Sequence, residues 1–245
     1  IFHIIIHVCT KEKELWQRMK NKNLAGILSI LLCEILFGFS YLFTKNITNS
    51  ISPINLLGWR FAVAFIVMNI CVAAGLVKIN FKGKPVLKLI GIAIFHPVLY
   101  FVGEAYGITM TTASESAVII ASLPLVTIAL SALIMKKLPA RIQVLGVATT
   151  ISGVIIITLA KGMEFLINPY GYLALFLGIV SYSIYAVCAE MSREFSNSEK
   201  TYVMILMGFI VFSSIALLYN AGRGQVMEFI KLPFSKPEFL AAILY

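Results

Sequence analysis

"LAGILSILLCEILFGFSYLF", residues 24–43, carries a single charged side chain, Glu34, in twenty residues. A helix that crosses the hydrocarbon core of a bilayer needs about 20 mostly apolar residues. This segment therefore predicts a membrane-spanning helix with a carboxyl group near its middle. An ionisable group at that depth costs about 2.5–3.5 kcal/mol on insertion scales, so each such residue is a candidate functional site.

The composition of the whole chain agrees with this segment. Hydrophobic residues make up 60% and charged residues 13% of the 245 residues, and the mean hydropathy is +0.93. Soluble domains have about 25% charged residues, so the chain is predicted to be an integral membrane protein in contact with lipids. The formal net charge of +9 does not indicate nucleic-acid binding, because the basic residues lie in short connectors between apolar runs.

Apolar runs of membrane-spanning length recur along the chain and are apolar at both odd and even positions. A transmembrane barrel would need shorter segments that alternate in polarity, so helices are favoured. We expect an all-α, polytopic membrane helix bundle, with an eighth span starting near Phe239. The seven predicted spans are Leu24–Phe43, Leu56–Val77, Leu87–Ile108, Ala117–Met135, Ile142–Ala160, Gly171–Ala189 and Thr201–Tyr219.

The connectors predict the orientation of the bundle. Lys and Arg concentrate in the N-terminal tail and in connectors 78–88, 136–141 and 193–200, whereas the connector "TMTTAS" (109–114) has no charge. Cytoplasmic connectors carry the excess of Lys and Arg in multi-pass proteins. We expect a multi-pass protein of the inner or plasma membrane with a cytoplasmic N-terminus.

Weak sequence similarities between segments of the chain indicate an internal repeat. "NLAGILSILL" (23–32) is echoed by "NPYGYLALFL" (168–177), and "KGKPVLKLIG" (82–91) by "FSKPEFLAAI" (234–243), in the same order. Because each repeat has an odd number of spans, five, the second copy must enter the membrane with the opposite orientation. Inverted repeats of this kind are typical of transporters, whose substrate site lies between the copies near the midplane.

The repeat predicts the domain organisation. Residues 1–22 are expected to form a cytoplasmic N-terminal tail, of which 1–18 can be an upstream extension before Met19. Residues 23–160 are expected to form the first five-helix repeat and 161–245 a truncated second one. The intact protein would have ten helices, of which about seven and a half are present here. We expect this fragment to be inactive alone unless it forms a homodimer.

Three segments resemble the EamA family of the drug/metabolite transporter superfamily. They are "FGFSYLFTK" (37–45) with "NLLGWRFAVAF" (55–65), then "YGITMTTASESAVIIASLPLVTIALSALIM" (106–135), and "RIQVLGVATTISGVIII" (141–157). The resemblance implies a ten-helix carrier for small organic solutes such as amino acids or other metabolites, often an exporter. One departure is "MKKLPA" (135–140), where the family often has an acidic residue. That departure weakens the transfer of roles to this loop.

Glu34 is the first candidate site residue. It lies near mid-depth of its span, where desolvation disfavours the charged carboxylate, so it can take up and release a proton as access alternates. The small multidrug transporters of the same superfamily have a first-helix Glu a few residues before a Gly. Glu34 and Gly38 resemble that pair, although the spacing in this chain is one residue longer. The alternative is a neutral carboxyl that is hydrogen-bonded to a neighbouring helix.

Arg60, Glu104 and Glu115 lie toward the same predicted side of the membrane. Arg60 is seven residues past Pro53, roughly 10 Å below the surface at 1.5 Å per residue. Arg60 can pair with Glu104 or Glu115 as a fixed ion pair that aligns helices. Alternatively, its guanidinium can hold a substrate carboxylate in a bidentate geometry.

His96, Tyr100 and Glu104 are spaced four residues apart, which places them on one face of the third span, with Tyr106 off that face. A polar stripe inside a membrane helix is better explained by a cavity than by lipid. Pro97 is expected to kink this helix.

Small and hydroxyl-bearing residues cluster around the third and fourth spans. Ser116 is a candidate site residue, although close helix packing is the expected main role of this cluster. Pro124 can break the fourth span and expose carbonyls. The cluster comprises Thr111, Thr112, Ser114 and Ser116, and the spaced pairs Gly103 with Gly107 and Gly146 with Gly153 are interpreted in the same way.

The sixth span offers the second repeat's contribution to a site. Tyr182 and Tyr185 lie within it, and Tyr185 is a candidate site residue; Glu190 lies near its cytoplasmic end and can be merely interfacial.

Cofactor and metal chemistry find no support in the sequence. No second His or Cys lies at ligand spacing from His96, so we expect no metal and no cofactor. The four cysteines show no CxxC motif, and we expect reduced thiols that pack as small hydrophobic side chains. They are Cys9, Cys33, Cys71 and Cys188.

The sequence therefore predicts a secondary transporter of a small-molecule solute, and no enzyme. It has no GxxxxGK[ST] loop for ATP, no HExxH or GxSxG motif and no clustered carboxylates. A channel-like pore, a membrane-embedded enzyme and a seven-helix scaffold remain the alternatives.

Overall fold

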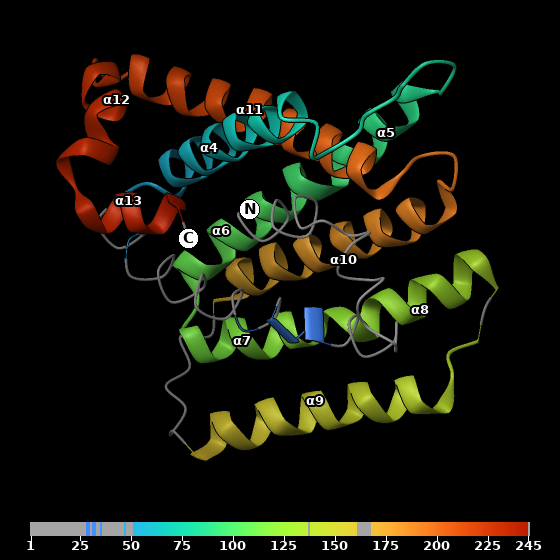
Figure 1. Ribbon diagram of the computed structural model, residues 1–245. Helices are drawn as coiled ribbons and strands as arrows, with labels where there is room; N and C mark the ends of the chain where they lie inside the picture. Colours follow the sequence, from blue (N-terminus) through green and yellow to red (C-terminus); the bar gives the residue numbers. More distant parts are fainter. Residues whose placement is uncertain are drawn as a thin grey trace. The chain divides into compact units, whose positions relative to one another are not determined.

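The computed structural model describes residues 28–29, 31–32, 35, 47, 51–136, 138–160 and 168–244. All regular elements within these residues are helices, as expected for an all-α bundle (Figure 1). Five helical stretches in the described residues are long and apolar enough to cross a membrane. They are Pro53–Ala73, Val86–Met110, Ser114–Met135, Pro169–Met191 and Asn197–Ala221.

These stretches confirm the second, third, fourth, sixth and seventh predicted spans to within a few residues. The fifth predicted span corresponds to α9 (Arg141–Ala160), which is also apolar. The eighth corresponds to the start of α13 (Pro237–Leu244), two residues before the predicted Phe239. Most of the first predicted span, including Glu34, lies outside the described residues.

The chain divides into two compact units, and each is described by itself. The first unit comprises residues 1–86 and 195–245, with α4 (Pro53–Ala73), α11 (Asn197–Ala221), α12 (Val226–Ser235) and α13. The second comprises residues 87–194. It holds α5 (Val86–Ala93, from its second residue), the π-helical segment η1 (Ile94–Leu99), α6 (Tyr100–Met110), α7 (Ala113–Ala121), α8 (Leu123–Met135), α9 and α10 (Pro169–Met191).

In the first unit, α4 and α11 lie side by side (Figure 1). Their contact is made by aromatic rings and by glycines at positions 58 and 208. Phe65 stacks on Phe209 with ring centroids 4.7 Å apart, and Phe61 stacks on Phe212 at 5.1 Å. Asn220 Nδ2 donates to Asn55 Oδ1 at 2.7 Å near one end of the pair. Because Asn220 is buried and Asn55 is half-buried, this hydrogen bond helps to fix the register of the two helices.

In the second unit, α10 packs on α6, η1, α7 and α8. The α6 contact is close because glycines face each other there: a Cβ added at Gly103 would lie 2.6 Å from the Ala174 carbonyl oxygen and 3.0 Å from Gly178 Cα. The predicted packing role of Gly103 and Gly107 is thus confirmed. For Gly146 and Gly153 no described atom lies within 4 Å of a Cβ at either position, so their packing role stays a prediction.

The fourth span is interrupted as the sequence suggested. α7 ends at Ala121 and α8 begins at Leu123, with Pro124 in the first turn of α8. Proline lacks an N–H and fits the first turn of a helix, so the break falls just before it. The Ser122 hydroxyl donates to the Ile119 carbonyl at 2.6 Å.

The cysteine expectation is confirmed at Cys188, which is free, and wrong at Cys71, which is disulfide-bonded. Cysteines that are far apart in the sequence reveal no pairing by spacing alone, which is why the sequence missed this bond.

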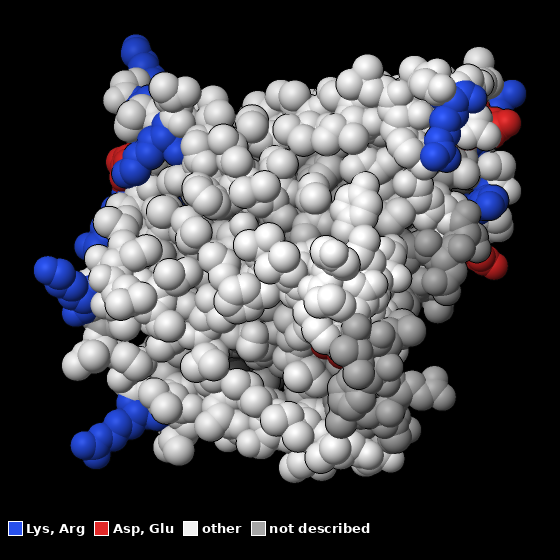
Figure 2. Space-filling view, turned by 180° about the vertical axis from the view of Figure 1, so that it is seen from behind, with Lys and Arg blue, Asp and Glu red and all other residues white. Residues whose placement is uncertain are grey.

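The surface agrees with a membrane environment. Away from its edges, the described part of the face in Figure 2 consists almost entirely of residues without charge. Large apolar side chains such as Leu133, Ile142 and Leu218 are more than 70% exposed. In a lipid environment such side chains are favourable, whereas in water they would be an aggregation hazard.

Candidate functional site

The third span is broken at its middle by η1. His96 has an extended backbone (φ −141°, ψ 117°) inside a helical stretch, and Pro97 follows it. Proline removes one backbone hydrogen bond and its ring clashes with the preceding turn, so the helix cannot continue straight. The predicted kink at Pro97 is therefore confirmed, and it lies near the middle of the span Val86–Met110.

Aromatic rings from two helices surround the His96 imidazole. Tyr185 and Tyr182 of α10 lie 4.9 and 5.1 Å from it between ring centroids. Tyr100 and Phe101 of α6 lie at 5.2 and 5.5 Å. The structure thus brings the predicted residues His96, Tyr100 and Tyr185 together, and it adds Phe101, which the sequence did not single out.

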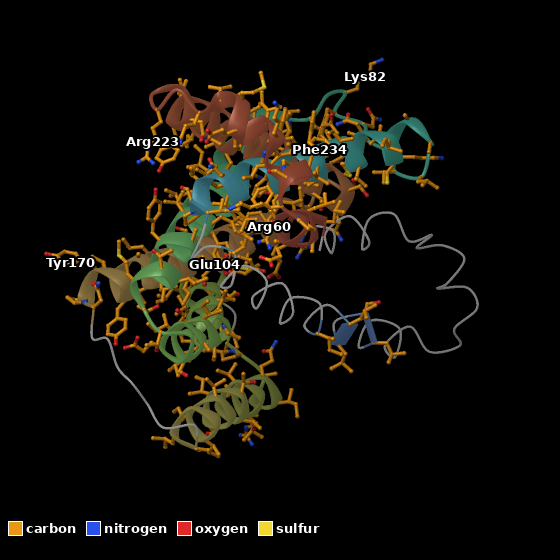
Figure 3. All side chains as sticks on the ribbon, turned by 90° about the vertical axis from the view of Figure 1, so that its left-hand side faces the viewer. Arg60, Lys82, Glu104, Tyr170, Arg223 and Phe234 are labelled. Atoms are coloured by element: carbon orange, nitrogen blue, oxygen red, sulfur yellow. The ribbon has the colours of Figure 1, made fainter. Side chains whose placement is uncertain are left out.

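Glu104 continues the polar stripe one turn along α6 (Figure 3). The Tyr100 hydroxyl donates to Glu104 Oε1 at 2.8 Å. The two residues, four positions apart in the sequence, therefore contact each other on one helix face, as predicted. Tyr106 is 46% exposed and lies off the stripe, as expected.

The His96 imidazole is 94% buried, and its Nδ1 atom has no hydrogen-bond partner among the described residues. A buried polar atom without a partner costs about 1–3 kcal/mol. A buried unsatisfied group in a native protein is commonly explained by an ordered water, an ion, local strain or a functional role.

A second polar link joins α8 to α10 in the same unit. The Thr127 and Ser183 hydroxyls lie 2.9 Å apart, and Ser183 is fully buried. The sequence did not single out either residue. Each of the two apolar runs contains more than one Ser or Thr hydroxyl, and the sequence does not say which two of them meet.

Glu115 and Ser116 lie at the start of α7 in a hydrogen-bonded turn. Glu115 Oε2 accepts from the Thr112 backbone N–H at 2.6 Å, and the Thr112 hydroxyl accepts from the Glu115 N–H at 3.2 Å, which is a capping box. The Tyr172 hydroxyl of α10 donates to the other oxygen of Glu115. Buried Ser116 donates to the Thr112 carbonyl at 3.0 Å. These contacts favour a structural role for both residues.

Arg60 lies on α4 in the first unit (Figure 3). Its Nε atom donates to the Ala242 carbonyl of α13 at 2.9 Å. Glu104 and Glu115 belong to the second unit, so the proposed pairing of Arg60 with either of them stays a prediction, as does the role of Glu34.

Among the described residues, no group of three or more His, Cys, Asp or Glu side chains could hold a metal ion. Glu190, at the end of α10, is exposed, which fits an interfacial position.

Comparisons with known proteins agree with this picture. The family described as the EamA-like transporter family matches residues 24–159. The chain is 30% identical over 229 residues to the uncharacterized transporter YcxC of Bacillus subtilis, covering 93% of this chain and 73% of that protein. It is 29% identical over 202 residues to the uncharacterized transporter YyaM of the same organism, covering 77% and 63%.

A third relative is an uncharacterized transporter in the sor 3′ region of Acidianus ambivalens, 29% identical over 112 residues, covering 46% of this chain and 44% of that protein. No solved structure matches this chain. The three relatives share the description as transporters, and none of their names states a substrate.

Proposed function

Because this chain belongs to the EamA-like transporter family, a family of the drug/metabolite transporter superfamily, we propose that it is a secondary transporter that exports small organic metabolites such as amino acids or drugs. The polar stripe of His96, Tyr100 and Glu104 is the observation that carries this proposal. It lies in the middle of a broken membrane-spanning helix, and Tyr182 and Tyr185 of α10 line it. Polar groups at that depth are typical of substrate and ion pathways.

Each group has a role in the proposal. The rings around His96 offer an apolar wall, and the imidazole Nδ1 offers a hydrogen-bonding atom to a solute. Glu104 offers a carboxylate next to the Tyr100 hydroxyl. Arg60 is proposed to hold a substrate carboxylate, because a guanidinium can bind it through two parallel hydrogen bonds.

Alternating access is proposed to come from two inverted repeats, residues 23–160 and 161–245, with the site between them and the N-terminus in the cytoplasm. The break at His96–Pro97 supports this, because discontinuous helices commonly form the substrate sites of transporters with inverted repeats.

Glu34 is proposed to couple transport to protons. A carboxyl group at mid-depth that alternates between protonated and ionised forms can carry one proton per cycle as its access changes sides. A membrane-embedded enzyme and a channel-like pore are the alternative functions. An enzyme would change its substrate chemically, and a pore would let a solute move only down its own gradient.

The test reconstitutes the full-length protein in liposomes and measures efflux of a broad metabolite panel with and without a pH gradient. The proposal predicts saturable flux of at least one solute, accelerated by the gradient. Glu34→Gln should remove the dependence on the gradient. If no solute moves, the proposed function is wrong; if flux keeps its pH dependence in Glu34→Gln, only the role of Glu34 is wrong.

A further inference from the structure

We infer that α12 is an amphipathic helix that lies in the plane of the membrane surface and binds lipid through Met227, Ile230 and Phe234. This inference does not depend on the proposed transport activity. The helix has ten residues, about 15 Å at 1.5 Å per residue, which is too short to cross a bilayer.

The neighbouring helices place α12 at the membrane boundary. It follows the membrane-spanning α11 after a short turn at residues 222–225, and α13 begins one residue after α12 ends. Figure 1 shows α12 turned across the end of α11, and α13, which follows it, packs against α4. A helix that lies across the end of a span runs along the membrane surface.

The residues of α12 fall on three distinct faces. At about 100° per residue, Phe229 and Pro233 share one face, and both are buried against the protein. The Trp59 indole of α4 donates to the Phe229 carbonyl at 3.0 Å, and the two rings lie 5.7 Å apart, so this face is firmly docked.

A second face is apolar and exposed. Met227, Ile230 and Phe234 follow one another at three- and four-residue spacing and are 62%, 44% and 87% exposed. The third face carries Glu228, Lys231 and Ser235, all exposed and polar. On a helix wheel the three faces are separated by roughly 100–140°. A soluble helix has two faces, protein and water; a third, apolar face fits a helix that also touches lipid.

Lipid is the occupant that the surroundings favour. Large apolar side chains are also exposed near the end of α11 that leads into α12, where Leu217 and Leu218 are 44% and 73% exposed. At the same end of α11, the Arg223 guanidinium lies 4.2 Å from the Tyr219 ring centroid. Tyrosine and arginine are enriched where a membrane meets water, because one end of each side chain is apolar and the other polar.

The test measures fluorescence quenching of the full-length protein in nanodiscs. Phe234→Trp places a tryptophan on the apolar face, and Ser235→Trp places one about 100° away on the polar face. Each emission is corrected for Trp16 and Trp59 by subtracting the unsubstituted protein. The quenchers are phosphatidylcholine brominated at shallow or deep acyl positions, and aqueous iodide.

The inference predicts that shallow bromines quench Phe234→Trp at least about twofold more than deep bromines do, and that iodide quenches mainly Ser235→Trp. Equal lipid quenching of the two variants, or stronger quenching of Phe234→Trp by deep bromines, would overturn it. If Phe234→Trp does not fold, Met227→Trp on the same face is compared with Ser235→Trp by the same criteria.

Discussion

The Lys84 ammonium lies 2.6 Å from Glu199 Oε2, and the Glu199 side chain is only 3% exposed. The same carboxylate accepts from the backbone N–H groups of Asn80 and Ser196, at 3.1 and 2.9 Å. It therefore joins the connector before the third span to the start of α11.

Lys84→Ala is expected to destabilise the protein much more than Lys88→Ala. Lys88 also lies 2.6 Å from its partner Glu194, but these side chains are 46% and 35% exposed. Removing one partner of a buried pair leaves a charge uncompensated, which costs about 3–5 kcal/mol when burial is complete, whereas exposed pairs contribute about 0–1 kcal/mol. Because Lys84 is 26% exposed, we expect a loss of about 1–3 kcal/mol in unfolding free energy.

Denaturant unfolding in detergent micelles measures both variants under the same conditions. Equal losses for Lys84→Ala and Lys88→Ala would contradict the role assigned to Glu199.

Gly103→Ala is expected to lower the melting temperature, because the new Cβ would lie 2.6 Å from the Ala174 carbonyl oxygen on α10. Overpacking of this kind costs about 1–3 kcal/mol. Gly146→Ala is the matched control, since no described atom lies within 4 Å of a Cβ there and alanine is the better helix former. Thermal unfolding followed by circular dichroism should show a lower midpoint for Gly103→Ala alone; unchanged midpoints in both would refute the close approach of α6 and α10.

Thr112→Ala is expected to lower the unfolding free energy by about 1 kcal/mol, because it removes the side-chain acceptor that caps α7. Thr150→Ala serves as control, since the Thr150 hydroxyl donates to the Gly146 carbonyl within α9 and caps no helix. If Glu115 acts mainly through this turn, flux per folded molecule should stay within about twofold of the unsubstituted protein in Thr112→Ala. A selective loss of flux at unchanged stability would instead assign the turn to the transport site.

Apolar run length predicted the helices well, because a span that meets lipid must be apolar over its whole length. The sequence also predicted the kink at Pro97 and placed Tyr100 one helical turn from Glu104, because both follow from the local geometry of a helix. It did not predict that Tyr182 and Tyr185 would face His96, nor that Thr127 meets Ser183. Those contacts depend on how separate helices pack. A sequence that is apolar on all sides of each helix carries little information about which sides pack together.

The same limit applies to the glycines. Gly103 and Gly146 look alike in the sequence, yet among the residues that the structure describes Gly103 lies close to another helix and Gly146 does not. A sequence-based hypothesis about small residues therefore identifies candidates for close contact, and the structure decides between them.

The most direct test of the account measures solute flux through Glu104→Gln in proteoliposomes, with Glu238→Gln as control at an exposed carboxylate. A glutamine at 104 can still accept the hydrogen bond from Tyr100, so folding should be preserved while the charge is lost. We expect Glu104→Gln to slow the initial rate at least about tenfold, which corresponds to about 1.4 kcal/mol, and Glu238→Gln to leave it unchanged. Equal rates for Glu104→Gln and the unsubstituted protein would contradict a substrate pathway along this stripe.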